Sequence, residues 1–171
     1  MSDEKKSQLA ILDKQCDRVI NWITFAEAKN AALIALNIAS MTVVAEIFDN
    51  TICWGAITLI LFIISTGISL VSFYPNNSGA ERDNSNILNY ANVSLLLNSK
   101  SYLDTYSLRY EDGEEMNYEN LKKDISNQIY NNSKIALKKN NYFKYALITD
   151  AFAFMTFFIF IAQVVGFEIR F

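Results

Sequence analysis

Four of the polar side chains that lie inside mainly apolar stretches of sequence are candidates for a gate or for contacts between helices. They are Asn37, Ser65, Ser69 and Asp150. Small polar residues let helices approach closely and form hydrogen bonds between them, so helix–helix packing is one interpretation. The other is that these groups line a pore or gate in an oligomer. A carboxylate inside a membrane is costly and usually faces protein or water, although Asp150 is close enough to the end of its segment to reach the interface or to pair with Lys144.

The residue types on which most enzymes depend are scarce. The chain has no histidine and only two cysteines, which lie far apart in the sequence. No phosphate-binding glycine loop and no paired-cysteine motif occurs. The net charge of −3 is too small and of the wrong sign for a general nucleic-acid binder. We therefore expect no enzymatic activity, no catalytic residue, no metal site and no nucleic-acid partner.

Three apolar segments must position the four polar groups. They are Ala31–Phe48, Cys53–Tyr74 and Tyr145–Phe167. A run of roughly 18 or more apolar residues is long enough to cross a hydrocarbon core of about 30 Å as a helix. The sequence therefore predicts an all-α integral membrane protein with three transmembrane helices.

The basic residues predict the orientation of these helices. Fourteen of the 15 lysines and arginines lie before the first apolar segment or between the second and the third, and the exception is Arg170. Short loops rich in Lys and Arg remain on the cytosolic side of a membrane. We therefore expect a cytoplasmic N-terminus, a tight outer turn near residues 49–52 and an external C-terminus.

The same patterns predict how the chain is divided. We expect a cytosolic amphipathic helix at 1–30, a transmembrane hairpin at 31–74, a cytosolic helical sensor region at 75–144, a third transmembrane helix at 145–167 and an external tail at 168–171. Apolar residues recur in steps of three and four before the first apolar segment. No proline or glycine occurs between Met116 and Val165, which allows one helix of roughly 50 residues and 75 Å. The first and third transmembrane helices should thus extend into a cytosolic stalk.

Three stretches carry a resemblance to a known family. They are Trp22-Ile-Thr-Phe-Ala-Glu-Ala-Lys-Asn-Ala-Ala, then Ile87-Leu-Asn-Tyr-Ala-Asn-Val followed by Tyr102-Leu, and finally Gln128-Ile with Ser133, Lys139 and Tyr142 through Lys144. In order and topology they resemble the membrane-spanning effectors of Pycsar anti-phage systems, the PycTM-like family. The first looks like the family's W-x-x-x-A-(D/E)-x-K-x-A element. The sequence departs from the family at Asn89-Tyr90, where an aromatic pair followed by a small residue is expected.

This resemblance implies a nucleotide-gated toxin in the bacterial inner membrane. In such systems a partner cyclase senses phage and makes cyclic CMP or cyclic UMP. The effector responds to this activating ligand by impairing the inner membrane, so that the infected cell dies or stops growing, an abortive infection. No other cofactor is implied. Three crossings per chain cannot enclose an aqueous pore, so the lethal assembly should be a homo-oligomer.

A bound cyclic nucleotide would need a cation for its phosphate and a stacking ring or an amide for its base. The candidates are Lys29, Lys139 and Lys144 as cations, Trp22, Tyr90 and Tyr142 as rings, and Asn89 and Gln128 as amides. Structural roles are the alternative for all of them. Trp22 and Tyr142 have the character of interfacial aromatics, and Lys29 and Lys144 that of ordinary positive-inside anchors.

Two other functions fit the same topology. One is a non-lethal membrane scaffold whose cytosolic helices bind a partner protein. The other is a membrane-disrupting effector that responds to a different trigger.

Overall fold

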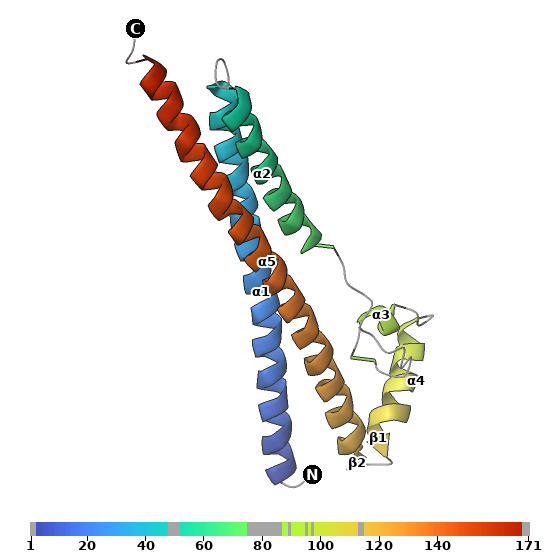
Figure 1. Ribbon diagram of the computed structural model, residues 1–171. Helices are drawn as coiled ribbons and strands as arrows, with labels where there is room; N and C mark the ends of the chain where they lie inside the picture. The colour runs from blue at the N-terminus through green and yellow to red at the C-terminus, as the bar shows by residue number, and fades with distance from the viewer. Residues whose placement is uncertain are drawn as a thin grey trace. The chain divides into compact units, whose positions relative to one another are not determined.

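The computed structural model describes residues 3–47, 52–74, 87–88, 90–94, 96, 98–112 and 115–168. Its elements in chain order are the helices α1 (Asp3–Glu46), α2 (Ile52–Val71), α3 (Tyr90–Val93) and α4 (Ser99–Tyr110), the strands β1 (Glu111–Asp112) and β2 (Glu115–Met116), and the helix α5 (Tyr118–Glu168) (Figure 1). Most of the predicted outer turn and Asn89 lie outside the described residues, as does the end of the predicted tail.

Helices α1, α2 and α5 are each long and apolar enough to cross a membrane. Neither α1, with 44 residues, nor α5, with 51 residues, contains a proline, and the only glycine in them is Gly166 near the end of α5. Nothing in their sequences therefore interrupts the backbone hydrogen bonds. Apart from the two-residue antiparallel pairing of β1 with β2, every described element is helical. These observations confirm the predicted fold class.

The chain forms two compact units. The polar unit comprises Met1–Ile23 and Asn76–Ala136, and the apolar unit comprises Thr24–Pro75 and Leu137–Phe171. Helices α1 and α5 contribute residues to both units, whereas α2 belongs to the apolar unit alone.

The apolar unit is a bundle of three helices, formed by the C-terminal part of α1, by α2 and by the C-terminal part of α5 (Figure 1). Its buried residues on α1 recur in steps of three and four, at Ala26, Asn30, Leu33, Asn37, Ser40 and Val44. Large apolar side chains such as Ile60 and Phe158 are more than half exposed. A bundle with polar groups inside and apolar groups outside suits a lipid environment, because lipid gives apolar side chains no reason to turn inward.

The polar unit contains the N-terminal parts of α1 and α5 together with α3, α4 and the β-strands. Asn98 caps α4, since its side chain accepts a hydrogen bond from the backbone N–H of Ser101 at 2.9 Å. The hydroxyl of Tyr118 at the start of α5 donates to Gln8 of α1 at 2.9 Å. This bond and the burial of Cys16, Val19 and Ile125 hold the two helices together within the unit.

A buried ion pair connects α4 to α5. The carboxylate of Asp124 accepts hydrogen bonds from the guanidinium of Arg109, one of them at 2.6 Å from Nη2, and from the hydroxyl of Tyr110 at 2.7 Å. The Asp124 side chain has no exposed surface, and that of Arg109 is 15% exposed. Burial and the hydrogen bond to Asp124 raise the pKa of Tyr110 above its ordinary value, so the hydroxyl remains a donor.

Candidate functional site

Buried polar side chains of the apolar unit, together with partly exposed ones that are bonded within the unit, follow one another along the bundle, and we call them the polar column. The column comprises Glu27, Asn30, Asn37, Thr58, Ser65, Ser69, Ser72, Lys139, Asp150 and Thr156. Polar groups inside a membrane bundle are satisfied by one another or by the backbone, because lipid offers no partners. The hydrogen bonds of the column therefore define how the three helices fit together.

At one end of the polar column, where the apolar part of α1 begins, a lysine joins the three helices. Lys139 of α5 forms an ion pair with Glu27 of α1 at 2.9 Å and donates to the backbone carbonyl of Ser72 at 2.7 Å. Asn30 donates to the carbonyl of Ala26 at 2.9 Å and to the hydroxyl of Ser72 at 3.1 Å. The side chain of Lys139 is 11% exposed, which strengthens these charged hydrogen bonds relative to surface ones.

The middle of the polar column contains the carboxylate of Asp150. Asn37 donates from Nδ2 to the hydroxyl of Ser65 at 3.1 Å, and that hydroxyl donates to the carbonyl of Ala146 at 3.1 Å. Asp150 is only 2% exposed and lies near enough for both Asn37 and Ser65 to act on its carboxyl group. Within the described residues, however, neither carboxylate oxygen of Asp150 has a hydrogen-bond partner of good geometry.

The position of Asp150 corrects one expectation. The interpretation that it reaches the interface or pairs with Lys144 is wrong, because its carboxylate is buried among the three helices and Lys144 is exposed. Three and four residues separate Ala146, Asp150 and Ala153, the buried positions of α5, so Asp150 lies on the inward face. The environment of Asp150 is therefore determined by the face of α5 on which it lies, more than by its distance from the end of the apolar segment.

Beyond Asp150 the column continues through hydroxyls and aromatic rings. Thr58 donates to Thr156 at 3.0 Å, and Thr156 donates to the carbonyl of Ala153 at 2.8 Å. The ring of Phe62, which is fully buried, meets that of Phe154 edge to face at 5.2 Å between centroids. The packing of this end is thus mainly apolar, and Asp150 is the one carboxylate buried in the described part of the bundle.

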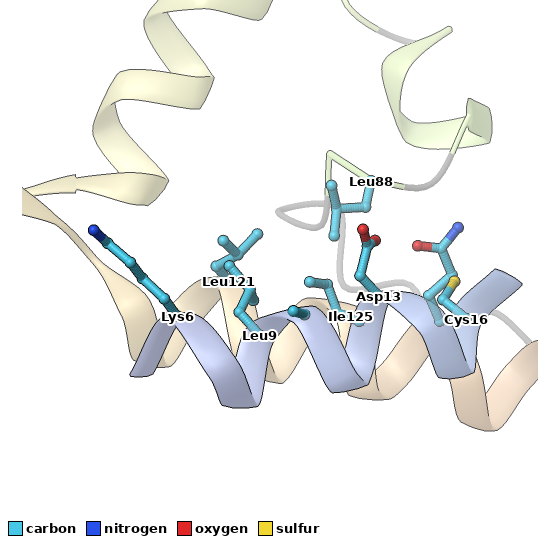
Figure 2. A pocket seen from close by; sticks show the side chains of 9 residues that line it. Lys6, Leu9, Asp13, Cys16, Leu88, Leu121 and Ile125 are labelled. Carbon is cyan, nitrogen blue, oxygen red and sulfur yellow. The ribbon is translucent and has the colours of Figure 1, made fainter. Parts of the chain in front are cut away.

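The polar unit contains a pocket of about 480 Å³. Its lining residues are Lys6, Leu9, Ala10, Asp13, Cys16, Leu88, Leu121, Ile125 and Gln128. Figure 2 shows the side chains of one face of α1 pointing towards it, with Leu88 on the opposite side and Leu121 and Ile125 coming from α5. The pocket thus has apolar walls and a few polar groups, as small-molecule sites usually have.

Three polar side chains give the pocket its chemistry. Lys6 supplies a cation, Asp13 an acceptor, and Gln128 an amide that can donate and accept. Burial, reinforced by nearby Asp17 and Asp13, raises the pKa of the Cys16 thiol, which therefore stays neutral and unreactive at neutral pH. Across the described residues, no group of three or more Cys, Asp and Glu side chains gathers that could hold a metal ion.

Among the predicted nucleotide ligands whose side chains the structure describes, only Gln128 lines this pocket. Lys139 is held by Glu27 and Ser72, and Lys29 donates to Asn140 at 3.1 Å and lies 4.7 Å from the ring centroids of Phe25 and Phe143. The structure gives these two lysines packing partners inside the apolar unit.

Three of the remaining candidates have described side chains, and none of these three lines the pocket. Trp22 is 56% exposed, Tyr142 is half-buried and Lys144 is exposed. Tyr90 lies in α3 with its side chain outside the described residues, and Asn89 is outside them altogether. Their role as nucleotide ligands stays a prediction.

The sequence analysis missed Lys6 and Asp13. They are seven residues apart, as are Leu9 and Cys16 beside them, so all four recur on one face of α1. The apolar stripe was recognised, but its charged neighbours were not considered as ligands. The sequence signal for these two residues is that charged side chains recur every seven residues along the edge of an apolar stripe.

The comparisons with known proteins give one match. The chain matches the family described as PycTM, Pycsar effector protein domain, over residues 11–166. Searches of curated proteins and of solved structures found no match. The match extends from the first turns of α1 almost to the end of α5 and confirms the resemblance found in the sequence. The chain therefore belongs to the PycTM family of Pycsar effectors, and it is an anti-phage defence effector associated with the membrane.

Proposed function

We propose that this effector responds to cyclic CMP or cyclic UMP made by a partner cyclase and then impairs the integrity of the bacterial inner membrane, which causes abortive infection. It acts without catalysis of its own and without a cofactor, the cyclic nucleotide being its activating ligand. Membership of the Pycsar effector family supports the link to a cyclase. The nature of the trigger and of the damage is the part that needs testing.

The polar column is the observation that carries this proposal. A helix bundle that only anchors a protein gains little from a buried carboxylate, since an acid inside the membrane is expensive to maintain. The apolar unit nevertheless buries Asp150 with Asn37 and Ser65 at its centre. Three helices cannot enclose an aqueous pore, so we propose that several copies assemble and that groups of the column become accessible to water or ions when they do.

The proposed orientation has the polar unit in the cytoplasm. Most of the chain's basic residues lie in the segments that form this unit or border it, as expected for cytoplasmic segments. The N-terminus is then cytoplasmic and the C-terminus external. In this orientation the pocket of the polar unit is accessible to a nucleotide made in the cytoplasm.

We place the nucleotide in the pocket of the polar unit. Its volume of about 480 Å³ lies within the range of roughly 300–1,000 Å³ typical of small-molecule sites. Lys6 is the pocket's cation for the cyclic phosphate, while Leu9, Leu121 and Ile125 supply apolar contacts for the ring systems. Asp13 and Gln128 are placed to hydrogen-bond the edge of a pyrimidine.

The first prediction concerns the membrane. Adding cyclic CMP or cyclic UMP to spheroplasts that contain the protein should depolarise the membrane within minutes, measured with a potential-sensitive dye. Cyclic AMP is the control and should have no effect. No depolarisation with either pyrimidine nucleotide at confirmed expression would contradict the proposal. A stable complex with a soluble protein and no toxicity would then favour the scaffold interpretation, and depolarisation by phage infection alone would favour another trigger.

The second prediction concerns the pocket. Lys6→Ala should weaken nucleotide binding about tenfold or more, because a charged hydrogen bond to a phosphate contributes roughly 1.5–3 kcal/mol. Isothermal titration of the purified protein in detergent measures this directly. Lys14→Ala removes an equal charge from an exposed position of α1 that does not line the pocket, and it should bind normally. Equal affinities for the two variants would place the nucleotide elsewhere.

A further inference from the structure

The middle of the polar column has more hydrogen-bond acceptors than donors. The Nδ2 group of Asn37 donates to Ser65, and the hydroxyl of Ser65 donates to the carbonyl of Ala146. Oδ1 of Asn37 and both carboxylate oxygens of Asp150 are buried and have no hydrogen-bond partner among the described residues. Apart from the second N–H of Asn37, the groups left over at this level are oxygens that can only accept, unless Asp150 is protonated.

The orientation of the amide follows from the network itself. A carbonyl oxygen cannot donate, so the hydroxyl of Ser65 must supply the hydrogen to Ala146. Ser65 then has only lone pairs to offer Asn37, and Asn37 must present its Nδ2 group to it. Turning the amide round would place two acceptors against each other. The unpartnered acceptor at Asn37 is therefore a property of the arrangement.

Only a very small species can complete these acceptors. Asp150 is 2% exposed and Asn37 is fully buried within a single chain. A side chain from a neighbouring copy cannot reach groups that the three helices of one chain already enclose. The missing partner is therefore a proton, a water molecule or a small cation.

The negative charge of Asp150 limits which of these three species can be the missing partner. None of the described residues forms an ion pair with Asp150, and α2 has no Asp, Glu, Lys or Arg. Lys139 is paired with Glu27, and Lys29 donates to Asn140. The other charged side chains described in the apolar unit, those of Glu46, Lys138 and Lys144, are all exposed. A water molecule would satisfy acceptors but would leave a buried negative charge without compensation, whereas a proton or a small cation would remove that charge.

We propose that Asp150, Asn37 and Ser65 form an intramembrane binding site for a small monovalent cation such as Na⁺. A single carboxylate balances one positive charge, whereas Ca²⁺ and Mg²⁺ need more oxygen ligands or more charge than the site provides. Oδ1 of Asn37 and the remaining lone pair of Ser65 complete the ligand set with neutral oxygens. The inference goes beyond the proposed function, since it concerns the resting protein and needs no nucleotide.

Bound sodium should stabilise the apolar unit, because a ligand that binds only the folded state raises its stability in proportion to the logarithm of its concentration. Thermal unfolding of the purified protein in detergent, without nucleotide, tests this. Sodium chloride is exchanged for N-methyl-D-glucamine chloride at constant ionic strength and pH. The Tm should rise by a few degrees with sodium, and radioactive sodium should bind to the unheated protein.

The matched variants neutralise one carboxylate each. Asp150→Asn should lose the sodium dependence of Tm, while Glu46→Gln, which changes an exposed carboxylate of α1, should keep it. Should Asp150→Asn not fold, Ser65→Ala tests the same site and should weaken sodium binding. A Tm of the unaltered protein that responds to pH but not to sodium would assign a proton to Asp150 and overturn the proposal. Neither result depends on a nucleotide response. A failure of the sodium-site proposal is therefore distinguishable from a failure of the proposed function.

Discussion

Replacing Asp124 by alanine should unfold the polar unit or leave it barely stable. The carboxylate of Asp124 is fully buried and accepts hydrogen bonds from Arg109 and Tyr110. Without it, the guanidinium of Arg109 would remain largely buried with a charge that its usual partner no longer balances, which costs about 3–5 kcal/mol. Because α4 and α5 are joined through this pair, the loss affects both helices.

Denaturant unfolding of the full-length protein in detergent, followed by circular dichroism, measures the loss, and limited trypsin digestion shows whether cleavage falls in the polar unit. Asp104→Ala removes an exposed carboxylate from α4 and should change stability little. Asp124→Ala with the stability and trypsin resistance of Asp104→Ala would show that the buried pair does not hold the unit together.

Replacing Lys139 by methionine should destabilise the apolar unit by roughly 2 kcal/mol. Methionine keeps most of the length and volume of the side chain but removes the charge that pairs with Glu27 and the N–H that reaches the carbonyl of Ser72. The Tm of the purified protein should fall by several degrees, and scanning fluorimetry in detergent measures it.

Lys138→Met is the matched control, since the adjacent lysine is exposed. It should unfold at the temperature of the unaltered protein. Titration with cyclic CMP separates this structural role from the ligand role predicted from the sequence. Normal Tm together with lost nucleotide binding in Lys139→Met would contradict the structural assignment and restore Lys139 as a ligand.

The sequence predicted the long helices well because their signals are local. The length of an apolar run and the absence of proline and glycine act within one segment, so α2 and the full length of α5 could be anticipated from composition alone. The short helix α4 (Ser99–Tyr110) lies within the region 75–144 that was predicted to be helical.

The partners of polar groups could not be predicted in this way. Whether Asp150 faces Lys144 or Asn37 depends on which face of α5 meets α1, and that is decided by packing between segments more than a hundred residues apart. Lys139 was considered a ligand because its type suits a phosphate, yet its type suits Glu27 equally well. The local sequence pattern identifies a candidate residue, whereas the tertiary contacts of its side chain decide which role it has.

Two serines of α2 and the serine that directly follows it have a consequence for motion. Ser65, Ser69 and Ser72 are buried on the same face, about one turn apart, and the hydroxyl of Ser69 has no hydrogen-bond partner among the described residues. If α2 slid along its neighbours by one turn, about 5.4 Å, each of these hydroxyls would move close to the place of the next, as in a ratchet. Such a step would bring the unpartnered hydroxyl of Ser69 to the place of Ser65 beside Asn37, while it would break the contacts of Thr58 with Thr156 and of Phe62 with Phe154.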